Sequence, residues 1–198
     1  HLTASARVYG VEILTWDYSA ATGTAGAKWA RVEVQAPGGG NTATVDDFYC
    51  TDDEFLGDIQ IGVLYPNAAG DSSAWTPSGA GLNWQQVEEH PADDDTTYVS
   101  TPTVDALDLY NLDDIDPAFE GTIKGAQALW LVKKSDEGAA VVKGQWKSEG
   151  VIVEGEEFAP TALNYLYSIQ AARKSLFTTD DWTPEEINDL QIGVKRTV

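Results

Sequence analysis

Short runs in which apolar and polar residues alternate recur along the chain, and alternation with a period of two is typical of β-strands. Clusters of Gly, Pro, Asn, Asp and Thr separate the runs, as turns do. The first run predicts either a pair of strands or one strand kinked at Gly10, and the three runs between residues 125 and 155 predict a meander. The runs lie at residues 6–16, 27–36, 43–50, 58–65, 125–134, 139–147, 150–155 and 164–172.

One hexapeptide pattern occurs twice: Asp58–Val63 reads DIQIGV and Asp189–Val194 reads DLQIGV. In each copy, three aliphatic residues fall on one face of an extended strand, and Gln and Gly fall on the other. This six-residue repeat is too short to indicate a duplicated domain, so we expect two strands that face the same core. The stretch after the first copy, residues 67–103, is rich in Gly, Ser, Asp and Thr and predicts long surface loops around LNWQQVEE.

The sequence contains one clear set of signals for the start of a helix. Thr183 suits the N-cap position, Pro184 the first helical position and Glu186 the third, where its side chain completes a capping box. These signals predict a short helix at residues 184–189.

Many short strands, frequent turn signals and a single short helix favour an all-β fold, an antiparallel β-sandwich that is jelly-roll-like. We expect one domain over residues 1–198. If the chain has two parts, the seam is expected near residues 63–80. Residues 1–65 would then supply N-terminal strands or a tether, and residues 66–198 the main sandwich.

The charge balance narrows the classes of partner. The chain carries 12 basic and 32 acidic side chains, a formal net charge of −20, and residues 1–120 hold 3 of the basic and 21 of the acidic ones. Nucleic acids and anionic membranes are bound by cationic surfaces, so we expect neither as a partner. A solvated acidic surface, a positively charged partner or cation binding remain open.

Apolar residues make up 42% of the chain, enough for a sizeable core. Its apolar runs fall well short of the roughly 18 residues of a membrane span, and the start, HLTASARVYGVEIL, lacks the blocks of a signal peptide. The single cysteine, Cys50, is surrounded by carboxylates that disfavour a reactive thiolate. We therefore expect a packed core thiol rather than a nucleophile.

Three acidic clusters are candidates for chemistry. One of them, residues 110–121, contains an Asp116–Pro117 step that predicts a turn. Residues 46–58 hold six carboxylates, and a glycoside hydrolase needs two at a defined separation. In residues 90–98, Asp93, Asp94 and Asp95 are candidates for a Ca²⁺ site, although adjacent acids do not match an EF-hand loop. A solvated turn is the simpler interpretation of each cluster. We expect no cofactor, because no phosphate-binding loop or nucleophile motif stands in its required context.

The aromatic residues supply the remaining candidates. Trp75 and Trp84 lie in or beside the Gly- and Ser-rich stretches, and Tyr98 follows the run of aspartates. Exposed aromatic side chains on loops can contact a sugar or anchor a protein partner. The alternative is that they close the ends of the sandwich. Trp130 and Trp146 lie within alternating runs, which places them in the core.

Several ordered motifs resemble those of a known group of proteins. Residues 45–101 carry a strand ending in FLGD, an LYPNAAG turn, a WTPS stretch and a PADDDTTY segment, and a DLY-type strand follows within residues 107–114. The closing stretch DWTPEEINDLQIGVKR is similar to a W-T-P motif at the end of the same proteins. Over residues 45–198 the chain thus resembles tailed-bacteriophage structural proteins in which a laminin-G/concanavalin-like strand block precedes a β-sandwich region.

The resemblance implies a non-enzymatic structural or accessory component of a virion, made in the bacterial host cytoplasm and acting through protein–protein contacts. Capsid decoration and tail or fibre association are both open. We expect other virion proteins as partners and a homo-oligomer or many-copy assembly. A carbohydrate-binding module that uses Trp75, Trp84 or Tyr98 is one alternative, with a glycan as its partner. A glycoside hydrolase with a carboxylate pair from residues 46–58 or 93–95 is another.

Overall fold

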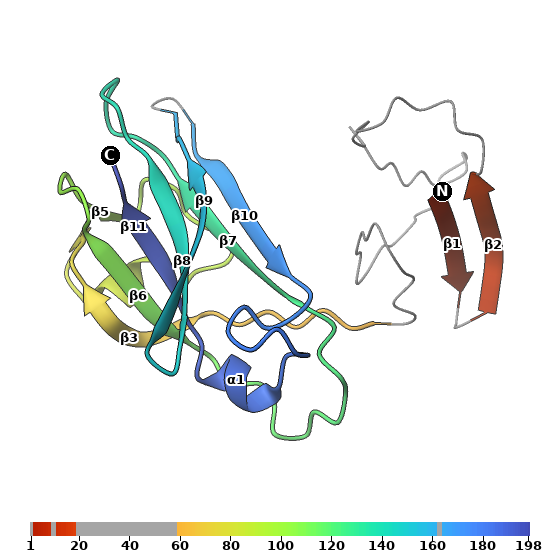
Figure 1. Ribbon diagram of the computed structural model, residues 1–198. Coiled ribbons are helices and arrows are strands. Elements are labelled where there is room, and N and C mark those ends of the chain that lie inside the picture. Colours follow the sequence, from red (N-terminus) through yellow and green to blue (C-terminus); the bar gives the residue numbers. More distant parts are fainter. Residues whose placement is uncertain (1, 9–10, 19–58, 162–163) are drawn as a thin grey trace. The chain divides into compact units, whose positions relative to one another are not determined.

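The computed structural model describes residues 2–8, 11–18, 59–161 and 164–198 (Figure 1). The chain divides into two compact units, residues His1–Gly62 and Val63–Val198. In the first unit, β1 (Leu2–Val8) and β2 (Val11–Tyr18) form an antiparallel pair, so the alternation at residues 6–16 belongs to two strands.

The second unit consists mainly of strands in antiparallel sheets, which confirms the predicted all-β class. Two short helical elements accompany them, the 3-10 turn η1 (Asn83–Gln86) and the helix α1 (Pro184–Asn188). The strands are β3 (Pro66–Ser73), β4 (Thr76–Pro77), β5 (Val99–Ser100), β6 (Leu107–Leu112), β7 (Ala126–Val132), β8 (Val142–Ser148), β9 (Val151–Phe158), β10 (Leu166–Ala172) and β11 (Gln191–Arg196).

Two sheets face each other across one core. The larger sheet has five strands in the order β3-β6-β11-β8-β9, and the smaller one pairs β10 with β7 (Figure 1). Gly144 of β8 lies directly beneath the indole of Trp130 from β7. A Cβ atom at Gly144 would come within 2.5 Å of that ring, so a larger residue does not fit there. The Trp146 indole N–H of β8 donates to Gln170 Oε1 of β10 at 2.7 Å. These contacts join the two layers into a sandwich.

Aromatic rings fill the space between the sheets. Trp146 is 1% exposed, and its ring lies edge-on to Trp130 at 6.3 Å and stacked on Trp182 at 6.1 Å between centroids. Trp130 and Trp146 therefore lie in the core, as predicted. Val194 of β11 and Ile187 of α1 complete the same cluster.

The predicted helix forms where its capping signals lie. Thr183 Oγ1 accepts a hydrogen bond from the Glu186 backbone N–H at 3.1 Å, and Pro184 occupies the first turn, so the helix start is confirmed. The predicted capping box is not completed, because the Glu186 carboxylate accepts a hydrogen bond from the Ser175 hydroxyl instead. Ile187 is the buried residue of this short helix. Its burial beside Trp182 lets α1 cover one part of the core before the chain enters β11.

The two copies of the hexapeptide adopt different structures. DLQIGV contributes β11, which pairs with β6 on one side and β8 on the other. Residues 59–65, which include most of DIQIGV, form no strand, so the expectation of two equivalent strands is wrong. The next strand, β3, begins at Pro66 and runs through a stretch that we predicted to be a loop. Pairing with β6 supplies the backbone hydrogen bonds that make it a strand. A proline fits the first position of an edge strand such as β3.

The predicted meander is correct for one pair of strands only. β8 and β9 form a hairpin through Glu149 and Gly150, whose φ angles of 47° and 82° suit a two-residue turn of type I′. β7 instead pairs with β10 in the smaller sheet. The Trp130 side chain of β7 packs on the face of β8 rather than at its edge.

Candidate functional site

The smaller sheet has an apolar surface that points away from the core. Successive strand residues point to opposite faces, so Leu129 and Leu131 of β7 share the outer face with Tyr167 and Ile169 of β10. Leu131 lies opposite Tyr167, and Leu129 lies opposite Ile169. Leu129, Tyr167 and Ile169 are 50%, 62% and 59% exposed. We call these four side chains the β7–β10 outer face.

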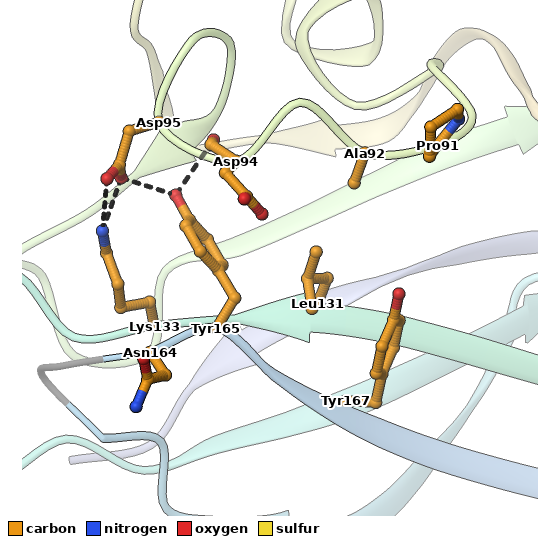
Figure 2. Close-up of a pocket in the computed structure, with 9 residues that line it drawn as sticks. All are labelled: Pro91, Ala92, Asp94, Asp95, Leu131, Lys133, Asn164, Tyr165 and Tyr167. Atoms are coloured by element: carbon orange, nitrogen blue, oxygen red, sulfur yellow. Dashed lines mark hydrogen bonds and ion pairs between the residues drawn. The ribbon is translucent and has the colours of Figure 1, made fainter.

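A loop closes over one end of this surface and leaves a hollow of about 460 Å³, which we call the loop cleft (Figure 2). Pro91, Ala92 and Asp94 line it from the loop, and Leu131 and Tyr167 line it from the sheet. Asp95, Lys133, Asn164 and Tyr165 complete the lining. The loop cleft is thus continuous with the β7–β10 outer face through Leu131 and Tyr167.

Charged and aromatic contacts fasten the loop to the sheet. Lys133 Nζ lies 2.5 and 2.7 Å from the two carboxylate oxygens of Asp95 and 4.6 Å from the centre of the Tyr165 ring. The Tyr165 hydroxyl donates to Asp95 Oδ1 at 2.9 Å and lies 3.0 Å from the Asp94 carbonyl oxygen (Figure 2). The hydrogen bond from Lys133 lowers the pKa of Asp95, and burial together with the Asp95 carboxylate raises the pKa of Tyr165.

The three candidate aspartates for a metal site have different surroundings. Asp93 Oδ1 accepts from the backbone N–H and the hydroxyl of Thr97 at 3.0 and 2.9 Å, within its own loop. Asp95 pairs with Lys133. In the part of the chain that the structure describes, no three His, Cys, Asp or Glu side chains are grouped so that they could hold a metal ion.

The predicted aromatic contacts lie elsewhere in the unit. Trp75 packs against the core, and its indole N–H donates to the Ala106 carbonyl oxygen at 3.1 Å. Trp84 is half-buried within η1, and Tyr98 is 39% exposed beside β5. Trp75, Trp84 and Tyr98 are not among the residues that line the loop cleft.

A buried carboxylate fixes the segment that carries Trp75. Asp108 of β6 is 0% exposed and accepts hydrogen bonds from the Trp75 backbone N–H at 2.7 Å, Asn83 Nδ2 at 2.6 Å and the Tyr110 hydroxyl at 2.9 Å. Burial, followed by the Asp108 charge, raises the pKa of Tyr110. Four groups from β6, η1 and the segment before it are thereby joined in the interior, which is a structural role.

Comparison with protein-family models, with curated proteins and with solved structures found no match. The resemblance to tailed-bacteriophage structural proteins therefore stays a prediction. Within the described ranges, no helix has the length and apolar character needed to cross a membrane. The strands expected at residues 27–36 and 43–50, Cys50 and the acidic cluster at residues 46–58 lie outside the described residues.

The sequence contained a usable signal for the loop cleft that our interpretation missed. Tyr165, Tyr167 and Ile169 follow one another at intervals of two, which places them on one face of a predicted strand. Three large side chains on the outward face of a short strand indicate an exposed apolar surface. The spacing of these residues does not predict that Leu131 and the loop at residues 91–95 lie beside them.

Proposed function

We propose that this chain is a non-enzymatic structural or accessory component of a bacteriophage virion, a capsid decoration or a tail- or fibre-associated protein, that acts through protein–protein contacts. The observation that carries the proposal is the β7–β10 outer face, where Leu129, Tyr167 and Ile169 are each at least half exposed. Contiguous apolar surface of this kind marks an interface in proteins that assemble.

The charge of the unit indicates the chemistry of the partner. Residues 63–198 contain nine Lys and Arg side chains and 23 Asp and Glu side chains. Such a surface repels acidic proteins and attracts basic ones. We therefore expect another virion protein whose apolar patch is rimmed by Lys or Arg, because complementary charge guides docking and apolar contact holds it. Repetition of the contact around a symmetric particle would give the many-copy attachment that such assemblies use.

The first experiment asks whether the chain is part of a particle. Virions of the phage whose genome encodes it are purified through a density gradient and analysed by quantitative mass spectrometry. The proposal expects this chain at a fixed stoichiometry to the major capsid or tail protein. Particles that lack the chain would contradict the proposal.

The second experiment asks whether the β7–β10 outer face makes the contact. The double substitution Leu129→Asp with Ile169→Asp places two carboxylates on the apolar face, and we expect the variant to fold but to be lost from particles. Ile152→Asp is the matched control, since Ile152 is 42% exposed on β9 of the other sheet. Equal incorporation of the double variant and the control would show that another surface makes the contact.

A further inference from the structure

The loop cleft combines features that the β7–β10 outer face lacks. Its volume of about 460 Å³ lies within the range of about 300–1,000 Å³ that is typical of small-molecule sites. Tyrosine rings, a proline and a leucine supply apolar walls, and carboxylate and amide groups lie among them. A site with both kinds of group suits a ligand that is itself part apolar and part hydroxylated.

The geometry points to a binding site in the loop cleft for a sugar residue that carries no negative charge, either neutral or amine-bearing. The cleft shares Leu131 and Tyr167 with the β7–β10 outer face, but the inference depends in addition on Tyr165, Asp94 and Asn164, which are not part of that face. It also differs from the glycan hypothesis based on Trp75, Trp84 and Tyr98, because those residues do not line the cleft.

Tyr167 provides the surface for stacking. Its side chain is 62% exposed, and it projects from β10 beside Leu131 (Figure 2). The C–H groups of a pyranose ring carry partial positive charge, and the face of an aromatic ring carries partial negative charge, so the two attract each other. An exposed ring on a paired strand is already positioned for this contact, which reduces the entropy lost on binding.

Tyr165 forms a fixed wall of the same cleft. Its hydroxyl is held by Asp95 and the Asp94 carbonyl oxygen, and Lys133 lies over its ring. Because these contacts restrain both the ring and the loop, the cleft does not have to be assembled by the ligand.

Asp94 supplies hydrogen-bonding capacity that the loop itself does not use. Among the described residues, its carboxylate has no hydrogen-bond partner, whereas its backbone adopts a left-handed conformation with φ of 58° and its carbonyl oxygen lies 3.0 Å from the Tyr165 hydroxyl. A carboxylate accepts hydrogen bonds from two neighbouring hydroxyl groups, as in a sugar diol. The lining amide of Asn164 offers both a donor and an acceptor.

The charges of the cleft determine which sugars it would admit. Lys133 offsets Asp95 through a bidentate contact, and within the described residues no basic side chain is paired with Asp94. An acidic sugar, such as a sialic or uronic acid, would place a second negative charge beside it, and like charges repel. A neutral glycoside meets no such repulsion, and an amine-bearing glycoside is attracted.

The test measures binding of methyl glycosides by isothermal titration calorimetry and by NMR shifts of the protein. The panel contains neutral hexosides, a methyl glucosaminide with a free amine, a methyl glucuronide and a methyl sialoside. We expect saturable binding of at least one neutral or amine-bearing glycoside and none of the acidic pair. Absence of binding across the panel, or binding of the acidic pair alone, would overturn the inference.

Two variants and one control locate the site. Tyr167→Ala should weaken binding by about two- to tenfold, the range for loss of one aromatic contact. Asp94→Asn, whose new side chain tolerates the left-handed backbone, should narrow the discrimination against acidic glycosides. Ile169→Ala is the control, because Ile169 is 59% exposed on the same strand but does not line the cleft. Equal losses in Tyr167→Ala and Ile169→Ala would contradict the assignment to the cleft. The titrations use the isolated protein, so their outcome does not depend on whether the chain is found in particles.

Discussion

The outer face of the five-stranded sheet carries paired charges beside the exposed Ile152, whereas the outer face of the two-stranded sheet is apolar and half exposed. On the larger sheet, Glu154 lies 3.2 Å from Lys143 Nζ and 3.4 Å from Lys195 Nζ. Lys147 pairs with Asp71 in the same way. On the smaller sheet, Leu129 and Ile169 are 50% and 59% exposed.

The difference indicates which face has a free-energy reason to bind a partner. Covering exposed leucine and isoleucine removes apolar surface from water and is favourable. Covering lysines and carboxylates that are already paired desolvates charges and gains little. Exposed ion pairs also contribute little to folding, so the stability of both sheets must come from the core that they share.

The core substitution Trp146→Ala should have the largest effect, because it removes the ring that joins the two sheets. Trp146 is 1% exposed, and we expect a loss of about 3–5 kcal/mol in the free energy of unfolding. Urea denaturation followed by circular dichroism measures it. Tyr167→Ala is the control, with an expected loss below about 1 kcal/mol at an exposed site. Comparable losses in the two variants would show that Trp146 does not hold the sheets together.

Gly144→Ala should have the second largest effect, because it pushes the two sheets apart. The added methyl group would lie 2.5 Å from the Trp130 ring, which is itself buried and cannot move away freely. We expect a loss of about 1–3 kcal/mol in urea denaturation. Gly62→Ala serves as the control, since a Cβ atom there meets nothing within 4 Å. A neutral Gly144→Ala variant would mean that the layers are packed less closely than described.

The charged face should respond to pH by a smaller amount. Hydrogen bonds from Lys143 and then Lys195 lower the pKa of Glu154 from its ordinary value of 4.5. A lowered pKa in the folded state stabilises the protein above the ordinary value, and this contribution is lost as the pH falls through the folded-state pKa. Glu154→Gln should therefore destabilise by up to about 1 kcal/mol at neutral pH and by less under acidic conditions.

Urea denaturation of the wild type and Glu154→Gln at about pH 7 and about pH 3 checks this expectation. Glu156→Gln is the matched control, a substitution of the same kind at an exposed position on the same strand. A destabilisation by Glu154→Gln that grew toward low pH would have the wrong sign for this explanation.

Changes on the apolar face should have the smallest effect on stability. Ile169→Thr keeps the β-branched shape of the side chain, and we expect a change within about 0.5 kcal/mol at this exposed position. Binding of a hydrophobic fluorescent dye should fall at the same time, because less apolar surface is displayed. The control is Ile152→Thr on β9. A large loss of stability in Ile169→Thr would show that this side chain supports the fold rather than faces a partner.

The elements that could be predicted from the sequence are those whose signals are local. Alternation identified β8 and β10, and the capping residues Thr183 and Pro184 identified α1. β3 was missed because its stretch of small and polar residues has little strand character of its own. Its place depends on pairing with β6, where a Cβ atom at Gly70 would lie only 2.6 Å from the backbone of Leu109.

The alternation of Tyr165 and Tyr167 was a local signal for the strand side of the loop cleft, but the loop that closes the cleft could not be predicted locally, for the same physical cause. The ion pair between Lys133 and Asp95 joins residues 38 positions apart, and the Tyr165 hydroxyl reaches Asp95 across 70 positions. The run of aspartates was visible, but its spacing gave no information on which of them would meet a lysine. The tertiary fold determines that Lys133 pairs with Asp95 rather than with Asp94.

The position of β11 in the sheet constrains the order in which the protein can fold during synthesis. β6 and β8 are separated in the larger sheet by a strand that begins at Gln191, long after β8 ends at Ser148. Until the ribosome releases that strand, each of its two neighbours has an edge without its native partner, and such edges invite pairing with other chains. A nascent chain stalled before residue 191 is therefore expected to depend on chaperones or to aggregate.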